Sequence, residues 1–550
     1  MDNPTGQGAR RAPARRAIGL PKKNANAKLQ RPRRPLGAAM SHTWTAAMWM
    51  AYATMRGSSA FTVHRSTGFR SGWQPMLPST SVVATIVLCF HIVGVFAAMH
   101  AVMTVRTAPG AIAWAGSLLL IPYLALVPYL VFGSSNFVGY VNARRFYRQQ
   151  MRELRHGMEP QEREACIVRQ PDHPGLRALP RLTGLHCLSG NHVQLLVDGQ
   201  ATFAAIFAAL KSARRVALVQ FFIVHDDELG RELQALLCER AAAGVEVYFL
   251  YDSIGCHALP GHYVRRMAEC GVKVSAFAPH RGFVNRFQLN FRNHRKLVVV
   301  DGERAFLGGH NVGNEYMGRT PPLAPWRDTH IEVRGPAVLD LQMTFAEDWY
   351  WASREVPTLL LPPPEPAGAM VCQVVPSGPA DSQETCSLFF VEAIQAARRR
   401  LWITTPYFVP DEAVFAVLRL AVLRGVDVRI LMPGRADHKV VFAASTLYAY
   451  QAICAGIRIY RYLPGFLHQK VMLIDDELAA VGTANLDNRS FRLNFELTVM
   501  TADRAFAGQV EGMLLADFAQ AREIGRDEYL GAPAPRRVAM HVAKLFAPIL

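Results

Sequence analysis

The sequence has few cysteines, and their spacing fits neither a metal site nor a set of disulfides. Nine cysteines are scattered over 550 residues, and no two are spaced as C-x-x-C. An odd number without paired spacing argues against a zinc site and against a disulfide-stabilised secreted fold. We therefore expect reduced cysteines and a reducing compartment for the globular part. The lysines of the repeated motif below separately predict no metal or other cofactor.

Acidic residues are nearly absent from the first 75 residues. This stretch contains thirteen lysines and arginines against Asp2 alone, so it carries most of the formal net charge of +17. The rest of the chain carries only a small excess of positive charge, which argues against nucleic-acid binding by its globular part. Residues 1–75 also lack an apolar period, which predicts a disordered basic extension. A targeting leader and a start site assigned too far upstream fit this composition equally well.

Charged residues are absent from two long apolar runs. The run "SVVATIVLCFHIVGVFAAMHAVMTV" covers residues 81–105, and "AIAWAGSLLLIPYLALVPYLVF" covers residues 111–132. A spanning helix needs about 20 apolar residues, so each run is long enough to cross a bilayer. Pro122 and Pro128 would bend the second helix, which membrane helices tolerate. We therefore predict a hairpin of two transmembrane helices over residues 81–133.

A cluster of positive charge follows the second run. Residues 142–156, "NARRFYRQQMRELRH", contain five arginines and one glutamate. By the positive-inside rule this flank lies in the cytoplasm, and two spans then place the basic N-terminus there as well. The same arginines could contact anionic head groups, although a merely solvated juxtamembrane helix would have the same composition.

Alternating strand and helix patterns occur twice after the hairpin. The first unit consists of residues 215–224, 228–244, 245–252, 262–271 and 272–277, and the second of residues 400–409, 412–425, 426–433, 445–456 and 457–463. Short apolar runs separated by helices that end at glycine predict mixed sheets flanked by helices. We therefore predict an α/β fold with two similar domains, residues 140–356 and 369–550, joined by a Pro-rich linker at 357–368.

Each unit is followed by the same pattern, His-x-Lys-x-x-x-x-Asp. It begins at His294 in "HRKLVVVD" and at His468 in "HQKVMLID". On a strand, the period of two would send each histidine and its lysine to one face. Gly-x-x-Asn follows each copy at the same distance, and two copies with matching spacing are very unlikely to arise by chance. The residues singled out by this pattern are His294, Lys296, Asp301 and Asn311 in the first copy, and His468, Lys470, Asp475 and Asn485 in the second.

This combination of residue types favours phosphate chemistry over metal binding. An ammonium group repels a divalent cation and offers it no lone pair, whereas lysines and amides stabilise a tetrahedral oxyanion. Of the two imidazoles, one can attack phosphorus and the other can protonate the leaving oxygen. The residues do not determine which is which. Asp301 and Asp475 are counted with the histidines and lysines as the catalytic set, although both end their strands, where a carboxylate often only anchors a turn.

With these motifs, the chain resembles the phospholipase D superfamily, and within it the bacterial cardiolipin synthases. The resemblance covers roughly residues 82–525 and extends to the hairpin and to "WRDTHIEVRGPAVLDLQMTFAEDW", "VVPSGPADS", "TPYFVPD" and "NFEL". The basic extension of about 75 residues departs from the family and leaves targeting open.

The resemblance implies a membrane-bound phosphatidyltransferase. His294 would attack the phosphorus of phosphatidylglycerol, and His468 would protonate the departing glycerol and then activate a hydroxyl of a second phosphatidylglycerol. Asp328 and Glu496 would each orient a histidine, that of the opposite half. The two lysines and two asparagines would hold the phosphate, and Asp301 and Asp475 would have structural roles.

The resemblance also implies partners and a location. The partners would be phosphatidylglycerol and an anionic membrane, with no nucleic acid, and the location the bacterial inner membrane with the catalytic domains facing the cytoplasm. The oligomeric state cannot be read from the sequence. Alternatives that share the chemistry are a phospholipase D-type hydrolase, a phosphatidyltransferase with another alcohol, and a nuclease. A non-catalytic membrane scaffold would be expected to carry a broken motif, and both copies are intact.

Overall fold

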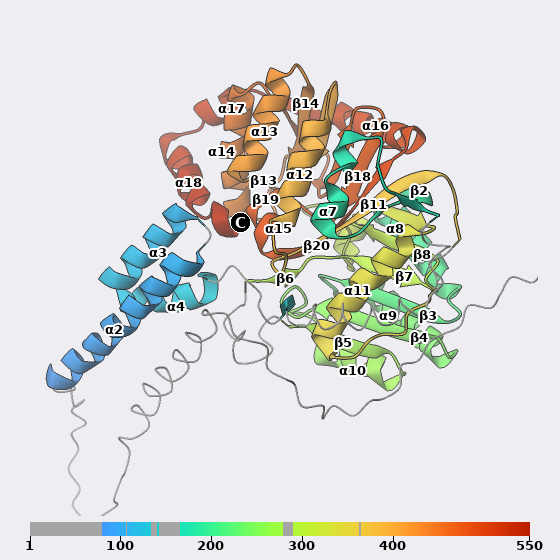
Figure 1. Cartoon of the computed structure of the whole chain (residues 1–550), viewed down its shortest axis with the longest axis horizontal. Coiled ribbons are helices and arrows are strands. Elements are labelled where there is room, and N and C mark those ends of the chain that lie inside the picture. The colour runs from blue at the N-terminus through green and yellow to red at the C-terminus, as the bar shows by residue number, and fades with distance from the viewer. Residues whose placement is uncertain (1–79, 106, 134–139, 142–164, 279–289, 362–364) are drawn as a thin grey trace, which may run out of the picture. The chain divides into compact units, whose positions relative to one another are not determined.

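The computed structural model describes residues 80–105, 107–133, 140–141, 165–278, 290–361 and 365–550 (Figure 1). The predicted basic extension, the arginine cluster after the second apolar run, and residues 362–364 of the predicted linker lie outside these ranges. Residues Phe90–Leu550 form one unit, and Gly19–Cys89 belong to another. The sheets and the candidate site described below lie within the first of these units.

The apolar runs at the N-terminal end form three helices instead of the predicted two. Helix α2 (Thr80–Thr104) is the one helix in the described ranges that is long and apolar enough to cross a membrane. The second run is divided into α3 (Ala108–Leu120) and α4 (Pro122–Phe132). The prediction of a single helix, bent at Pro122 and Pro128, is therefore not confirmed for the second run. Pro122 has no backbone N–H to continue the ladder and starts a new helix instead.

Two sheets of the same design form the rest of the molecule. The first runs β2 (Cys187–Val197), β10 (Thr329–Arg334), β8 (Arg304–Gly308), β7 (Leu297–Val300), β3 (Val216–Phe221), β4 (Glu246–Asp252), β5 (Lys273–Phe277). The second runs β11 (Met370–Ser377), β20 (Asn494–Ala502), β18 (Leu478–Gly482), β17 (Val471–Ile474), β12 (Arg400–Thr404), β14 (Asp427–Pro433), β15 (Arg458–Tyr462), β21 (Ala521–Ile524).

The strand directions repeat in the same order. Strands β3, β4 and β5 are parallel, as are β12, β14 and β15, and the other pairings within the two sheets are antiparallel. The long strand β2 joins the sheets, because its first part pairs with β11 and its second part with β10. The prediction of an α/β fold with mixed sheets is confirmed. Below, the first half means residues 188–353 and the second half residues 370–524.

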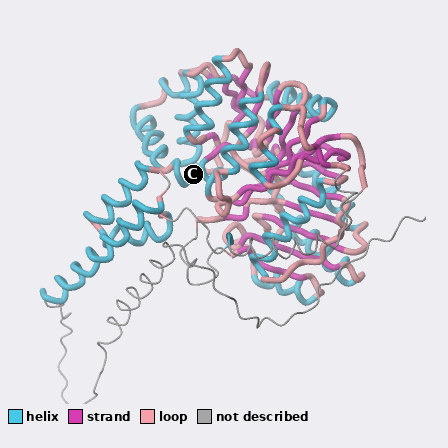
Figure 2. Tube along the Cα trace, in the orientation of Figure 1, coloured by secondary structure: helices cyan, strands magenta, loops and turns pink. Residues whose placement is uncertain are grey.

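Helices cover both sheets (Figure 2). Helices α8 (Asp198–Lys211), α9 (Glu228–Ala242) and α10 (Gly261–Glu269) pack on one face of the first sheet. Helices α12 (Thr385–Ala396), α13 (Glu412–Leu423) and α14 (Lys439–Cys454) share a core with the second sheet. The other faces of both sheets form one shared core with α11 (Ala337–Ser353) and α16 (Arg504–Ala519). This shared core makes the two halves one body.

The start of the first predicted domain packs elsewhere than expected. Leu176, Leu179 and Cys187 lie in the core of the second half, beside Phe389 of α12. Leu176 and Leu179, which precede β2 in the chain, therefore help to cover one face of the second sheet. A boundary drawn from the order of the chain cannot show this, because β2 belongs to both sheets.

One pair of cysteines differs from the expectation of reduced thiols. Cys238 on α9 and Cys270 at the end of α10 form a disulfide. The two helices pack against each other on the same sheet face, which brings together side chains that are 32 residues apart in the sequence. Their separation along the chain carried no signal of this contact. The described cysteines outside this pair are free, and Cys187, Cys256, Cys372 and Cys386 are buried.

Candidate active site

Two short parallel strand pairs join the halves at the site. Strand β6 (Arg292–Asn293) pairs with the start of β20, and β16 (Phe466–Leu467) pairs with β9 (Trp326–Arg327). Each pair ends immediately before a motif histidine on one strand and an acidic residue on the other. The backbone N–H of His294 then donates to the carbonyl of Phe495 (2.9 Å), and that of His468 to the carbonyl of Arg327 (2.8 Å). Two equivalent bridges therefore place each histidine opposite the acid of the other half.

The motif histidines and lysines precede their strands. Strand β7 begins at Leu297 and β17 at Val471, so the prediction that these residues lie on the strand is wrong. The alternation of side chains nevertheless continues through the bridging segment. Asn293 and Arg295 both reach Asp348, whereas His294 turns to Glu496. The segment is extended but leaves the sheet because it has to cross to the other half.

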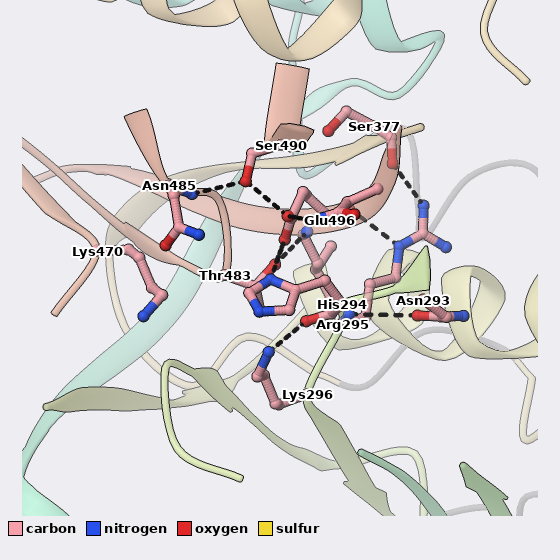
Figure 3. A network of polar contacts seen from close by, with 12 residues as sticks. Asn293, His294, Arg295, Lys296, Ser377, Lys470, Thr483, Asn485, Ser490 and Glu496 are labelled. Atoms are coloured by element: carbon pink, nitrogen blue, oxygen red, sulfur yellow. Dashed lines mark hydrogen bonds and ion pairs between the residues drawn. The ribbon is translucent and has the colours of Figure 1, made fainter. Parts of the chain in front are cut away.

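His294 is paired with Glu496 inside a set of donors from the second half (Figure 3). Its Nδ1 lies 2.9 Å from Oε2 of Glu496, whose side chain is fully buried. The same carboxylate accepts hydrogen bonds from the hydroxyls of Thr483 (2.5 Å) and Ser490 (2.8 Å) and from the amide of Asn494 (3.1 Å). Although burial alone would raise it, the pKa of Glu496 is lowered overall by His294, by the charge of Lys296 and by the hydroxyl of Thr483, so the carboxylate stays ionised.

His468 is paired with Asp328 in the equivalent place. Nδ1 of His468 lies 2.7 Å from Oδ2 of Asp328, and the backbone N–H of Thr329 donates to Oδ1 (2.8 Å). A Cβ on Gly309 would lie 1.9 Å from Oδ1, so only glycine fits beside this carboxylate. Burial would raise the pKa of Asp328, but the charges of Lys470 and His468 hold it well below its usual range.

Both imidazoles are prepared to act through Nε2. The carboxylate fixes Nδ1 as the protonated nitrogen, which leaves the lone pair on Nε2 for a substrate. Burial lowers the pKa of His294 to about 4 and that of His468 to about 3, so both rings are neutral near pH 7 when no anion is bound. An arriving phosphate would raise both pKa values by its negative charge. A bound phosphate therefore favours the protonated form of either ring.

The two motif lysines lie beside the histidines and are buried. The ammonium of Lys296 donates to the carbonyl of His294 (2.7 Å), and that of Lys470 donates to the carbonyl of His468. Burial lowers the pKa of Lys470 to about 8 and that of Lys296 well below its usual range. Figure 3 shows both side chains near the His294 ring, although they come from different halves. Two partly desolvated ammonium groups favour an anion in the space between them.

The two motif asparagines are not equivalent. Asn311 Oδ1 accepts from the backbone N–H of Ile223 (3.1 Å), and its amide donates to the hydroxyl of Tyr316 (3.3 Å). The side chain of Asn311 is therefore held by its own half, and its contact with phosphate stays a prediction. Asn485 is held through its backbone N–H by Ser490 (3.0 Å), and its side-chain oxygen is buried without a protein partner. Of the two, Asn485 is the better candidate for contact with a substrate.

The motif aspartates anchor loops and do not reach the histidines. The carboxylate of Asp301 accepts the backbone N–H groups of residues 214, 215 and 216, at 2.8 to 2.9 Å. Asp475 accepts those of residues 398, 399 and 400 in the same way, at 2.8 to 3.3 Å. Both aspartates have φ of 51°, in the left-handed region that Asp tolerates better than most residues. This agrees with the structural role that the family resemblance implied.

Sequence reasoning missed a buried support behind each histidine. Arg295 donates to both oxygens of Asp348 on α11 (2.8 and 2.9 Å) and to the carbonyl of Glu496 (3.0 Å). In the second half, Asp517 on α16 binds Arg327 (2.6 and 2.9 Å) and Gln469 (3.0 Å). The available signal was that each motif has a polar residue between His and Lys, which alternation sends to the opposite side.

The arrangement suits attack on a phosphodiester. Nucleophile, acid and two cationic groups converge, while the carboxylates stabilise positive charge on the rings. Among the described residues, no group of three or more His, Cys, Asp or Glu side chains could hold a metal ion. The residues brought together are His294, Lys296, Glu496, His468, Lys470, Asp328 and Asn485.

Comparisons with known proteins agree with this geometry. Residues 390–517 match the family described as "Cardiolipin synthase, PLD-like domain". The chain is 58% identical over 463 residues to "Cardiolipin synthase A" of Pseudomonas entomophila (strain L48), covering 84% of this chain and 97% of the relative. It is 57% identical over 472 residues to "Cardiolipin synthase A" of Pseudomonas fluorescens (strain SBW25), covering 85% and 98%.

Solved structures agree on the fold. A crystal structure of phosphatidylserine synthase from Haemophilus influenzae Rd KW20 superimposes with a TM-score of 0.50 at 14% identity, covering 65% of this chain and 95% of the other. At that identity the likeness concerns the fold alone. The relatives of nearly full length, together with the paired motifs, decide the family: the chain belongs to the bacterial cardiolipin synthases of the phospholipase D superfamily.

Proposed function

We propose that this chain is a membrane-bound cardiolipin synthase that transfers a phosphatidyl group from one phosphatidylglycerol to another. The observation that carries the proposal is the crossed pairing of His294 with Glu496 and of His468 with Asp328, in a chain whose relatives of nearly full length are named cardiolipin synthase A. Neither half alone contains a complete histidine and acid pair. The unit of activity is therefore the joined body.

The first step forms a covalent intermediate. Nε2 of one histidine, which we take to be His294, attacks phosphorus, and the bond from phosphorus to the glycerol oxygen breaks. The protonated Nε2 of His468 gives its proton to that oxygen, and glycerol leaves. Lys296 and Lys470 stabilise the negative charge on the non-bridging oxygens. Glu496 stabilises the positive charge that the attacking ring acquires.

The second step reverses the roles. Nε2 of His468, now neutral, takes the proton from a hydroxyl of a second phosphatidylglycerol. That oxygen attacks phosphorus, the bond from phosphorus to His294 breaks, and cardiolipin is released. With water in place of the second lipid, the same steps would give phosphatidic acid. The choice of acceptor therefore separates a synthase from a hydrolase.

We further propose that the protein resides in the bacterial inner membrane. Helix α2 is long and apolar enough to span a bilayer, and α3 and α4 together are as long as the second predicted span. The arginine-rich stretch at 144–155 favours a cytoplasmic catalytic body. Protease added to sealed inner-membrane vesicles should cut this body from the cytoplasmic face, and cleavage from the other face would contradict the topology.

Labelled phosphatidylglycerol tests the activity. Membranes containing the wild type should convert it to cardiolipin and glycerol without added divalent metal, and His468→Ala should not. Phosphatidic acid as the main product would show a hydrolase instead. Full activity of His468→Ala would contradict the mechanism. To identify the nucleophile, rapid denaturation of single-turnover reactions with detergent at mildly alkaline pH, where a bond from phosphorus to histidine is stable, should trap the labelled lipid on His294 in the wild type, whereas label on His468 would reverse the assignment.

A further inference from the structure

The C-terminal helix presents an apolar row to the outside of the molecule. Helix α18 (Ala534–Leu545) packs on α14 through Met540 and Ala543, which are buried. On its opposite side, Val538, Val542, Leu545 and Phe546 are 62%, 49%, 77% and 48% exposed. Their spacing of four, three and one residues places these four side chains on one face of about 100°. We call them the α18 row.

The charged residues of the helix itself have a single sign. Residues 534–545 include Arg536, Arg537 and Lys544, and no Asp or Glu. Lys544 lies over the ring of Tyr448 on α14, with 5.2 Å from Nζ to the ring centre, so its charge lies close to the body beside the row. A short helix with an exposed apolar face and basic flanks has the form of a helix that lies in the interface of an anionic bilayer.

The helix is also attached to the wall of the active site. After α18, the chain ends at Leu550, whose carbonyl accepts the backbone N–H of Arg489 (2.9 Å) on α15 (Asn488–Arg492). The same short helix carries Ser490, which binds Glu496. Continuous contacts therefore join the α18 row to the carboxylate that orients His294. A lipid surface held at α18 would lie next to an element that forms the site.

We propose that α18 docks on the surface of an anionic lipid bilayer, with the α18 row inserted among the acyl chains and Arg536, Arg537 and Lys544 at the head groups. This contact holds the catalytic domains at the surface of the membrane that contains their substrate. A second copy of the chain could also cover an apolar face, but a helix with three basic residues and no acidic ones would repel its own copy. The bilayer is therefore the better match in charge. The proposal rests on a lipid substrate and adds a second point of attachment besides α2.

Photochemical cross-linking tests the contact directly in the full-length protein. A benzophenone side chain is introduced in place of Val542, and the protein is reconstituted into vesicles of phosphatidylglycerol and phosphatidylethanolamine with a labelled lipid. The matched control carries the same group in place of Leu423, which is 81% exposed at the end of α13. We expect at least five-fold more lipid label at position 542. Equal labelling at both positions, or a cross-linked dimer as the main product at 542, would overturn the proposal.

Kinetics test the consequence for turnover. The double variant Val538→Asp, Val542→Asp should need about ten times more vesicle phosphatidylglycerol to reach half of its maximal rate. Its rate on a short-chain, micelle-soluble phosphatidylglycerol should stay within about two-fold of the wild type. Leu423→Asp should change neither quantity. If the double variant needs no more vesicle phosphatidylglycerol than the wild type, α18 does not hold the catalytic body on the membrane. An equal loss of rate on the soluble substrate would also refute this role. If the wild type makes no cardiolipin, the proposed function fails, while the cross-linking result still decides where α18 lies.

Discussion

Glu496→Gln is the sharpest test of the crossed pairing, because the replacement has the same shape and the wrong hydrogen-bonding pattern. The hydroxyl of Thr483 accepts from the backbone N–H of Leu497 (2.9 Å), so its proton points at Oε2 of Glu496. The hydroxyl of Ser490 accepts from the N–H of Asn485, so its proton points at Oε1. In either orientation of the glutamine side chain, its NH2 group would therefore face a hydroxyl whose proton already points toward it, so that two donors would meet.

Two effects follow from this, one on stability and one on turnover. A buried donor left without an acceptor costs about 1–3 kcal/mol, so the free energy of unfolding should fall by about that amount. A hydrogen bond to a charged group contributes about 1.5–3 kcal/mol. Losing the hydrogen bond between Glu496 and His294 in the transition state, in which the His294 ring becomes positive, should slow turnover roughly 10- to 150-fold. The loss of rate should exceed what a loss of folded protein can explain.

The assay compares initial rates of cardiolipin formation from labelled phosphatidylglycerol, per folded molecule, with thermal unfolding measured on the same samples. The control is Glu332→Gln, another buried carboxylate, which binds Arg304 and Arg334 and touches neither histidine. We expect the control to lose stability and to keep its rate per folded molecule. A wild-type rate in Glu496→Gln, or equal losses of rate in both variants, would refute the reasoning.

Two further predictions follow from the same site. Because burial lowers the pKa of Lys470 to about 8 and that of Lys296 well below its usual range, both ammonium groups lose charge as the pH rises, so kcat/KM should fall above about pH 8. Lys470→Arg keeps one of the two charges and should lessen this alkaline decline. A wild-type profile that is flat to pH 9.5 would contradict the assignment. Asp301→Asn and Asp475→Asn should each lower the free energy of unfolding by about 1–3 kcal/mol in urea titrations, because an amide replaces a carboxylate that accepts three backbone N–H groups. Their rates per folded molecule should stay near that of the wild type, and a stable but inactive variant would show that the aspartates take part in the chemistry.

Much of the chemistry could be predicted from the linear sequence. Two copies of one motif at the same spacing singled out both histidines and both lysines, since a repeated local pattern can be read without knowing the fold. The alternating apolar runs identified five elements in each half for a similar reason. These features depend on the period of side chains along a single element.

Other features depended on contacts between distant residues. The disulfide between Cys238 and Cys270 was not predicted, nor were the contacts that hold Asn311 within its own half. In both cases the deciding partner lies elsewhere in the chain: Tyr316 and the N–H of Ile223 hold the side chain of Asn311, for example.

The sequence by itself determined the residue types of the site, the repeat and the class of chemistry. Only the tertiary structure decided how the two copies combine. The strand pairs β6 with β20 and β16 with β9 exchange histidine and acid between the halves, and they depend on a register that no local pattern encodes. The buried Asp348 and Asp517 then hold the crossing segments from behind. The physical reason is that propensity and periodicity act along one segment, whereas a site at an interface is created by packing two segments against each other.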